Sequence, residues 1–269
     1  MSHPVLRRPV LIYLPCYNCA GVVGGVLRAI PAAFQECAEI LLVDNASPDQ
    51  TGPVMAAALA AQPPPLPCHV IRTRRNLGYA GSQKLAYEVA LANPAVEHVI
   101  MLHGDGQYPP ELTVQFLTAR ADQLDIAYGY RSKIRFGRRE ETPLVTFAMI
   151  RILSILESIA TLTFRKEWHT GFMMYSTRFL RRVPLQLLTD TPHVDGHLLY
   201  AGKVLDARVR GIPIYKRYKN FVAFSGPERA HYVLNVLRLM FRFRSISLSS
   251  RAPEKMFTPA DYEFLHRSP

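Results

Sequence analysis

A single aspartate on a glycine-flanked loop is the first group in this sequence that could do chemistry. Asp105 lies in "MLHGDGQYPPE" (101–111), directly after an apolar run. Carboxylate oxygens are ligands for hard divalent cations such as Mg²⁺ or Mn²⁺. A catalytic cation usually has more than one hard ligand, and the position two residues earlier is His103. The loop is a metal site that lacks a ligand, a metal site built another way, or a turn.

Three other polar segments follow apolar runs in the same way: "PCYN" (15–18), "VDNASPDQT" (43–51) and "RTRRNLGYAGSQK" (72–84). In the second of them, Asp44 and Asn45 end an apolar run, and Thr51 is placed to cap a helix. Alone, this is an ordinary strand–turn–helix. A carboxylate at the end of a strand is not expected to be a core element, so we expect Asp44 to be replaceable with little loss of stability.

The elements that position these segments alternate between strands and helices. Apolar runs predict strands at 9–15, 39–44, 68–73 and 98–103, and helix-length segments lie between them, at about 19–30, 51–62 and 79–92. This alternation predicts an α/β fold with a mostly parallel central sheet and helices on both faces. In such a sheet, functional residues lie at the carboxyl ends of the strands.

Composition limits the class of protein. The chain has 269 residues, enough for one large domain or two small ones, and it is 49% hydrophobic and 20% charged, which is ordinary for a folded soluble protein. Its longest apolar stretch, 144–164, is interrupted by Arg151 and Glu157, so no membrane-spanning segment is expected. Four cysteines and the absence of a signal-peptide pattern predict a cytoplasmic protein. The net charge of +11 predicts an anionic partner.

In their order and spacing, the polar segments resemble the family 2 glycosyltransferases, particularly the branch typified by dolichyl-phosphate mannose synthase and bacterial polyprenyl-phosphate enzymes. The resemblance covers about residues 9–216 and includes three further segments: "GYR" (129–131), "HTGFMMYS" (169–176) and "IPI" (212–214). Three departures stand out. Cys19 stands where an acidic residue often follows the family's opening P-x-Y-N. Asn45 replaces the second aspartate of one motif, and His103 replaces the first aspartate of the family's D-x-D. The resemblance implies the Rossmann-like, nucleotide-sugar-binding GT-A fold.

The resemblance also implies a site for a nucleoside-diphosphate sugar. Asp105 and Gln107 would hold Mg²⁺ or Mn²⁺ against the donor's diphosphate, so we interpret the loop as a metal site built another way. Asp44 would hold the nucleoside. The residues implied in donor binding are Pro15, Tyr17, Asn18, Asp44, Asn45, Asn76, Gly78, Lys84 and Asp105. For Lys84, a solvated position on a helix is an equal alternative.

Two residues are candidates for action on the acceptor. Asp195, in "PHVDGH", is the candidate general base that a hydroxyl acceptor would require, and an N-cap of the following helix is an equal alternative. Arg131 opens the basic segment 131–139, and Arg217 and Lys219 are similarly placed cations. A lipid phosphate is already anionic and needs no strong base. These cations therefore favour a polyprenyl-phosphate or other lipid-linked acceptor.

A boundary is predicted between a catalytic domain, 1–226, and a basic amphipathic helix and tail, 227–269. That helix would lie on an anionic membrane surface, or dock its apolar face on the domain or on a second subunit. The apolar helix at 144–164 is expected to be buried against the protein or in a homodimer. We therefore predict an inverting glycosyltransferase, peripheral on the inner face of the cell membrane.

Two other functions stay open at this point. One is a soluble glycosyltransferase that uses Asp195 as the base for a hydroxyl acceptor. The other is a catalytically silent nucleotide-sugar-binding protein, which would explain Asn45, His103 and Cys19 together. No nucleic-acid partner is expected, because the basic residues lack interleaved aromatic side chains or a nucleic-acid-binding motif.

Overall fold

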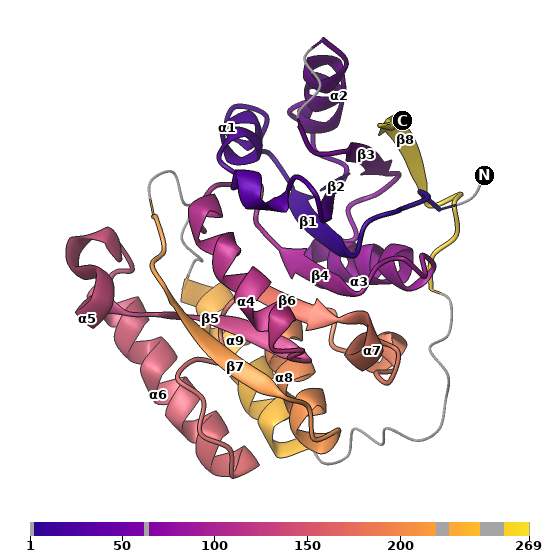
Figure 1. The fold of residues 1–269 in the computed structure, drawn as a ribbon. Coiled ribbons are helices and arrows are strands. Elements are labelled where there is room, and N and C mark those ends of the chain that lie inside the picture. Colours follow the sequence, from indigo (N-terminus) through magenta and orange to yellow (C-terminus); the bar gives the residue numbers. More distant parts are fainter. Residues whose placement is uncertain (1–2, 62–64, 219–225, 243–255, 269) are drawn as a thin grey trace.

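Eight strands form one sheet in the computed structural model, which describes residues 3–61, 65–218, 226–242 and 256–268 (Figure 1). Along the sheet their order is β7-β5-β6-β4-β1-β2-β3-β8. Their bounds are β1 Val10–Cys16, β2 Ala38–Asp44, β3 Cys68–Thr73, β4 His98–Met101, β5 Ile126–Arg131, β6 Met173–Ser176, β7 Val209–Ile214 and β8 Tyr262–His266.

The strand pairs show which way the chain runs. β1 is parallel to β2 and to β4, β2 is parallel to β3, and β5 is parallel to β7. The pairs β4–β6, β5–β6 and β3–β8 are antiparallel. The predicted α/β fold with a mostly parallel sheet is confirmed, because four of the seven pairs are parallel. The carboxyl ends of β1, β2 and β4 therefore lie at one edge, where the loops after them meet.

Helices cover both faces of this sheet, as predicted. Successive side chains of a strand point to opposite faces. In β1, Leu11 and Tyr13 join a buried cluster with α3, α7 and α8, whereas Ile12 and Leu14 join another with α1, α2 and α4. The helices are α1 Val23–Arg28, α2 Thr51–Ala61, α3 Gly78–Leu91, α4 Gln115–Ala121, α5 Lys133–Phe136, α6 Leu144–Thr161, α7 Thr177–Leu180, α8 Val194–Val204 and α9 Gly226–Arg242. Short 3₁₀ turns lie at Ala32–Phe34, Pro110–Val114, Gly137–Arg139 and Leu185–Leu187.

The C-terminal segment belongs to this same fold. β8 pairs with the outer side of β3, and its Tyr262 hydroxyl lies 2.8 Å from the His3 Nδ1 atom. α9 turns Val236 and Met240 inward, which matches docking of its apolar face on the domain. The division expected at residue 226 stays a prediction. β8, which lies after it, pairs with β3 and so extends the same sheet.

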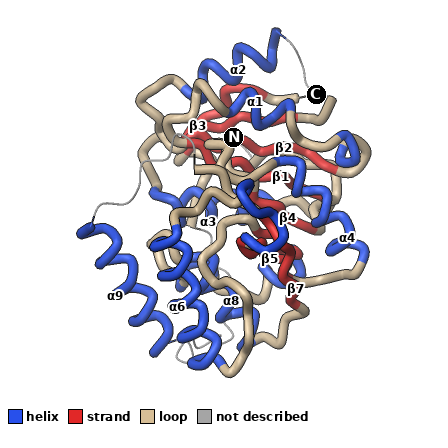
Figure 2. Tube along the Cα trace, turned by 90° about the vertical axis from the view of Figure 1, so that its left-hand side faces the viewer, coloured by secondary structure: helices blue, strands red, loops and turns tan. Residues whose placement is uncertain are grey.

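α6 differs most from its expectation. It lies beside α9 on the outside of the molecule (Figure 2). Only a third of the helix is buried, and Ile152, Ile155 and Ile159 are 59%, 55% and 65% exposed. Of the two covers expected for this helix, the protein itself supplies only part, and cover by a second subunit stays a prediction. By length and composition, α6 is the one helix among the described residues that could cross a membrane.

Candidate functional site

The loop that carries Asp105 and Gln107, called the metal loop after its predicted role, lies directly after β4, at the carboxyl edge of the sheet. Gly104 N donates to the Pro15 carbonyl at 3.1 Å, which ties the loop to the end of β1. Gly106 has a φ of +72°, a left-handed conformation that favours glycine. Asp105 is exposed, and its Oδ1 accepts a 2.9 Å hydrogen bond from Gln107 N. This backbone contact fixes the turn between the two residues. Asp105 presents its carboxylate at the surface, whereas the side chain of Gln107 is buried. Carboxylate and amide oxygens are of the type that a hard divalent cation takes.

His103 points inward from the same loop. Its Nε2 lies 3.5 Å from the Tyr79 hydroxyl, and its ring meets the Tyr108 ring edge-on. Burial lowers the pKa of His103 to about 4, an effect that Asp105 opposes and Lys216 reinforces. The imidazole is therefore neutral at neutral pH. His103 packs against Tyr79 and Tyr108 on the inner side of the loop, whereas Asp105 is exposed on its outer side.

The ends of β1 and β2 form the wall expected for the nucleotide. Asn45 N donates to the Cys16 carbonyl at 2.9 Å, and Asn18 N donates to the Ser47 hydroxyl at 3.1 Å. Asn18 has a φ of +54°, and both it and Tyr17 are exposed at this turn. Pro15, Tyr17 and Asn18 are thus brought together with the loop after β2, as the sequence predicts.

Asp44 is fully buried, and the expectation that it is not a core element is wrong. Its Oδ1 accepts from Ser47 N at 3.0 Å, and its Oδ2 accepts from Gly52 N at 3.1 Å. These bonds satisfy donors in the turn and at the start of α2, where backbone N–H groups lack helical partners. Asp44 therefore holds together the loop between β2 and α2 from within.

Asn45 joins the second and third strand ends. Its Nδ2 donates to the Asn76 side-chain oxygen at 2.9 Å and to the Gly78 carbonyl at 3.1 Å. Its Oδ1 accepts from Leu77 N at 2.8 Å. An amide can donate and accept in this way, whereas a carboxylate only accepts. The asparagine that departs from the family motif thus has a specific structural role.

Lys84 lies away from this group. Its side chain is buried, and its Nζ donates to the Leu188 carbonyl at 2.7 Å and to Asp190 Oδ1 at 2.6 Å. It is not the solvated helix residue of the sequence-based alternative. Because its ammonium group joins α3 to the segment before α8, we do not assign it to the nucleotide pocket.

Asp195 lies inside the first turn of α8 and is not its N-cap, which is His193. Its carboxylate is buried and accepts hydrogen bonds from Tyr79 at 2.8 Å, Gln83 at 2.6 Å and Tyr175 at 2.9 Å. Burial raises the pKa of Asp195 to about 6, although these three donors oppose the rise. Tyr79 also contacts His103, so Asp195 is connected to the metal loop through one side chain.

Arg131 ends β5 and is buried beside Glu167. Its Nη1 lies 3.4 Å from Glu167 Oε1, and its Nη2 donates to the His169 carbonyl at 3.2 Å. Burial lowers the pKa of Arg131, but the Glu167 charge outweighs this and raises the pKa above its usual range. Among the described residues, Arg131 Nε has no hydrogen-bond partner, and Nη1 has only the Glu167 carboxylate of this ion pair, without hydrogen-bond geometry. These two groups are donors suited to an anionic ligand.

Lys216 is a residue that the sequence interpretation missed. It is buried just after β7, and its Nζ lies 4.8 Å from the Tyr108 ring centroid. Burial, followed by the Arg131 charge, lowers the pKa of Lys216 to about 8, and Asp105 acts in the opposite direction. Its charge therefore acts on the metal loop and on Arg131 together. Period-two alternation after Ile212 and Ile214 is a signal that could have found it.

The other two cations expected near the acceptor differ from Lys216. Arg217 N donates to the Gln107 carbonyl at 2.8 Å, which ties the chain after β7 to the metal loop. Its side chain turns outward to Glu111, at 2.8 Å. Lys219 lies outside the described residues.

Two surface hollows lie at the opposite edge of the sheet, beside Glu39 and beside Glu97, and their linings include none of the predicted site residues.

Residues 11–188 match the family model described as glycosyl transferase family 2. The match spans more than half of the chain. This chain belongs to glycosyl transferase family 2. The membership makes it a glycosyltransferase by family. None of the curated proteins matches this glycosyltransferase in sequence.

Solved structures of similar fold are glycosyltransferases too. Glucosyl-3-phosphoglycerate synthase from Mycobacterium tuberculosis in complex with UDP has a TM-score of 0.64 at 16% identity, covering 97% of this chain and 87% of that chain. The same enzyme with Mn²⁺ and UDP-glucose has a TM-score of 0.63 at 16% identity, with the same coverage. Mannosyl-3-phosphoglycerate synthase from Rubrobacter xylanophilus has a TM-score of 0.61 at 15% identity, covering 94% and 79%. These likenesses confirm the GT-A fold.

Proposed function

We propose that this glycosyltransferase moves a sugar, with inversion, from a nucleoside-diphosphate sugar to a lipid-linked phosphate at a membrane surface. The observation that carries the proposal is the exposed apolar side of α6 next to Arg131. The Arg151 guanidinium, on α6, donates to the Arg131 carbonyl and to the Lys166 carbonyl. These bonds attach α6, whose isoleucines are exposed, to the end of β5, where the Arg131 side chain is buried.

The donor half of the site supports this function independently of the acceptor. Asp105 and Gln107 are the residues that would hold Mn²⁺ or Mg²⁺, and such an ion neutralises the charge that develops on the leaving diphosphate. Mn²⁺ and UDP-glucose are named together in a solved complex of similar fold. The turn 15–18 and the Asn45–Asn76 contact would position the nucleoside. We therefore propose UDP-sugars first as donors.

Arg131 and Lys216 are the residues that we propose for the acceptor phosphate. The Arg131 Nε and Nη1 groups are buried donors, and Lys216 brings a second positive charge from β7. A phosphate anion already carries the negative charge of a nucleophile, so the reaction needs binding and orientation more than a general base. Asp195 would then act by positioning Tyr79 under the metal loop.

A soluble phosphorylated acceptor is the second candidate. It is favoured by the glycosyltransferases of similar fold, whose names include phosphoglycerate as the acceptor part of the product. The same two cations would bind its phosphate. The two candidates share the donor site and differ in two respects. A lipid phosphate attacks through its own anionic oxygen, whereas phosphoglycerate attacks through a hydroxyl that needs a general base, for which Asp195 is the candidate. Only the lipid acceptor requires α6 to meet a membrane.

The deciding experiment gives the full-length protein UDP-[¹⁴C]glucose and Mn²⁺ with two competing acceptors. These are polyprenyl phosphate in anionic vesicles and 3-phosphoglycerate in solution. We expect radioactivity in the lipid extract, and we expect Arg131→Ala to remove it while Arg210→Ala, an exposed arginine on β7, keeps it. UDP-mannose and GDP-mannose are tested in parallel. Label that enters only 3-phosphoglycerate would establish the second candidate instead.

A further inference from the structure

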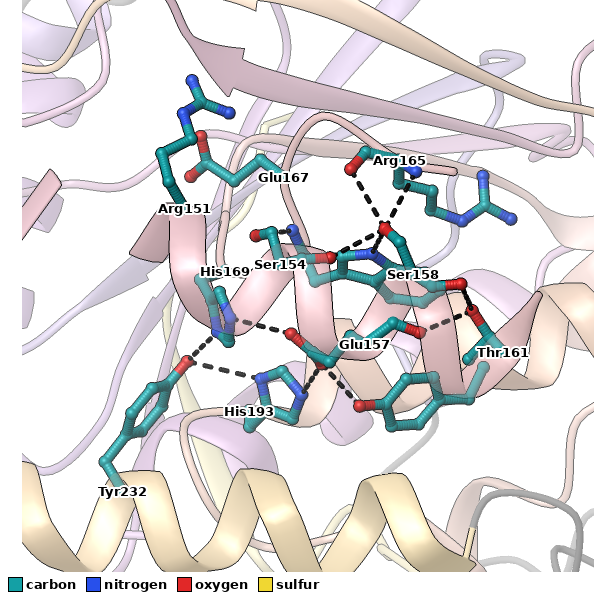
Figure 3. A network of polar contacts seen from close by, with 12 residues as sticks. Arg151, Ser154, Glu157, Ser158, Thr161, Arg165, Glu167, His169, His193 and Tyr232 are labelled. Carbon is teal, nitrogen blue, oxygen red and sulfur yellow. Dashed lines mark hydrogen bonds and ion pairs between the residues drawn. The ribbon is translucent and has the colours of Figure 1, made fainter. Parts of the chain in front are cut away.

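A buried group of three side chains of metal-binding type lies next to Arg131 and includes neither Asp105 nor Gln107. Glu157 comes from α6, His169 from the segment before β6, and His193 from the N-cap of α8 (Figure 3). We call these three residues the Glu–His–His cluster. Their ligand atoms all lie within 4.8 Å of one another, and no other such group occurs in the part of the chain that the structure describes.

The cluster is closed to solvent and converges on one point. His193 Nε2 lies 2.9 Å from Glu157 Oε1, and His169 Nε2 lies 2.8 Å from Glu157 Oε2. The Glu157 side chain is completely buried, and the two histidine side chains are nearly so. Both imidazoles therefore direct Nε2, the nitrogen that commonly binds metals, at a single carboxylate.

One of these contacts is not aligned as a hydrogen bond. Although Glu157 Oε2 and His169 Nε2 are 2.8 Å apart, neither atom has a hydrogen-bond partner of suitable direction. Buried polar atoms are almost always paired, so each such exception calls for an explanation. A cation between the three side chains would use the lone pairs of both atoms.

The opposite nitrogens of the two rings share one hydroxyl. Tyr232 Oη lies 2.8 Å from His169 Nδ1 and 3.3 Å from His193 Nδ1. A tyrosine has a single hydroxyl proton, so it can donate to only one of them. If both Nδ1 atoms carry protons, both donate to the Tyr232 oxygen and both Nε2 atoms are left as lone pairs. This is the pattern of metal-binding histidines, whose other ring nitrogen donates to an outer acceptor.

We propose that the Glu–His–His cluster binds a divalent cation of the zinc class. Two imidazoles and one carboxylate form a set that zinc uses in proteins, with a fourth position for water. Imidazole suits zinc and its neighbours better than the hard Mg²⁺ or Mn²⁺, which take oxygen ligands. The two sites would then select different ions by their ligands. The oxygen ligands at Asp105 would select a hard cation, and the imidazoles of this cluster would select a softer one.

The ion would stabilise the acceptor side of the enzyme. It would join α6 to α8 and fix His169, whose carbonyl accepts from Arg131 Nη2 at 3.2 Å. The exposed helix and the buried arginine would then keep one relative position. The role is structural, because the cluster is closed to solvent.

The first test measures zinc in the full-length protein by inductively coupled plasma mass spectrometry after gel filtration in zinc-containing buffer. We expect one zinc per chain in the wild type and in Asp105→Asn, and loss of that zinc in Glu157→Gln. His98→Gln, which changes a buried histidine of β4, is the matched control and should keep the zinc. A wild type without stoichiometric zinc, or a folded Glu157→Gln that keeps it, would overturn the proposal.

The second test covers the case in which Glu157→Gln does not fold. Tyr232→Phe keeps all three ligands and removes only the outer hydroxyl. Competition with a zinc chelator should show affinity lower by about 10- to 100-fold, the usual effect of an outer partner. Replacement of zinc by Co²⁺ should give visible absorption of a four-coordinate ion in the wild type. Unchanged zinc affinity in Tyr232→Phe, or no Co²⁺ spectrum, would contradict the site.

Discussion

At the scale of single residues, Asp105 and His103 stand two positions apart with opposite surroundings. Asp105 is exposed beside Gln107, whereas His103 is a neutral ring under the loop. We expect Asp105→Asn to reduce Mn²⁺-dependent transfer by on the order of 100-fold or more, because a cation loses its carboxylate. His103→Ala should cost less than about tenfold. Calorimetry of UDP binding with and without Mn²⁺ checks the assignment, which full activity of Asp105→Asn would refute.

Asp195 provides a pH test. Burial raises the pKa of this carboxyl from 3.8 to about 6, so the folded protein holds the proton more tightly than the unfolded chain does. The contribution to stability is therefore complete below about pH 4 and is lost as the pH rises towards 6. Asp195→Asn should remove this part of the pH dependence, measured as melting temperature from pH 4 to 7.

The same variant reports on the acceptor. With a phosphate acceptor, Asp195→Asn should retain transfer within about tenfold of the wild type, because no strong base is needed. Collapse of transfer, together with a wild-type rate that rises through pH 6, would instead identify Asp195 as the general base for a hydroxyl.

Asp44 can be tested by stability alone. Its carboxylate accepts from Ser47 N and Gly52 N inside the protein, so Asp44→Ala leaves two buried donors unpaired. We expect a loss of about 1–3 kcal/mol in the free energy of unfolding, along with weaker nucleotide binding. Urea denaturation measures the loss, and a variant as stable as the wild type would speak against this role.

The residues that sequence reasoning located best are those in segments with a recognisable order, such as Asp105, Asn45 and Arg131. Lys216 was missed because a cation beside Arg217 and Lys219 looks like one more solvated charge. The orientation of a side chain depends on where the strand register places it, and here the register turns Lys216 inward and Arg217 outward. Glu157 was noticed only as an interruption of an apolar helix. Its partners come from segments distant in sequence, which no local pattern reveals.

At the scale of elements, α6 offers the sharpest prediction. Ile155 and Ile159 are one helical turn apart on its exposed side. We expect Ile155→Glu with Ile159→Glu to weaken binding to anionic vesicles by roughly tenfold per isoleucine, the loss expected when a side chain can no longer be buried in lipid. Vesicle flotation measures the binding. Val54→Glu, at an exposed position on α2, is the control, and equal binding of both proteins would refute membrane contact by α6.

The elements themselves were largely predictable. The four expected strands begin and end within about two residues of β1 to β4, because buried parallel strands give near-continuous apolar runs. The sequence did not predict in the same way which side of α6 is buried and which is exposed. An apolar helix has the same sequence pattern whether its apolar side meets the protein, a lipid or a second subunit. Only the arrangement of the neighbouring elements shows which side is left exposed.

At the scale of the whole molecule, the net charge of +11 predicts how the protein meets an anionic surface. Attraction between a peripheral protein and acidic lipids is screened by salt over about 8 Å at physiological ionic strength. Vesicle binding by the wild type should therefore fall steeply between low and high salt. The isoleucine variant of α6 should lose nearly all binding at high salt, where only apolar contacts remain. Binding that is independent of salt would exclude the electrostatic part of this proposal.

The pairing of β8 with β3 also bears on how the chain is made. Ser268 meets Cys68 across 200 residues of sequence, so β3 leaves the ribosome long before its outer partner exists. Until then, β3 exposes an unpaired edge, which is a template for pairing with another chain. Such distant pairings also form slowly. During synthesis, the edge of β3 therefore stays open to pairing with other chains until β8 arrives.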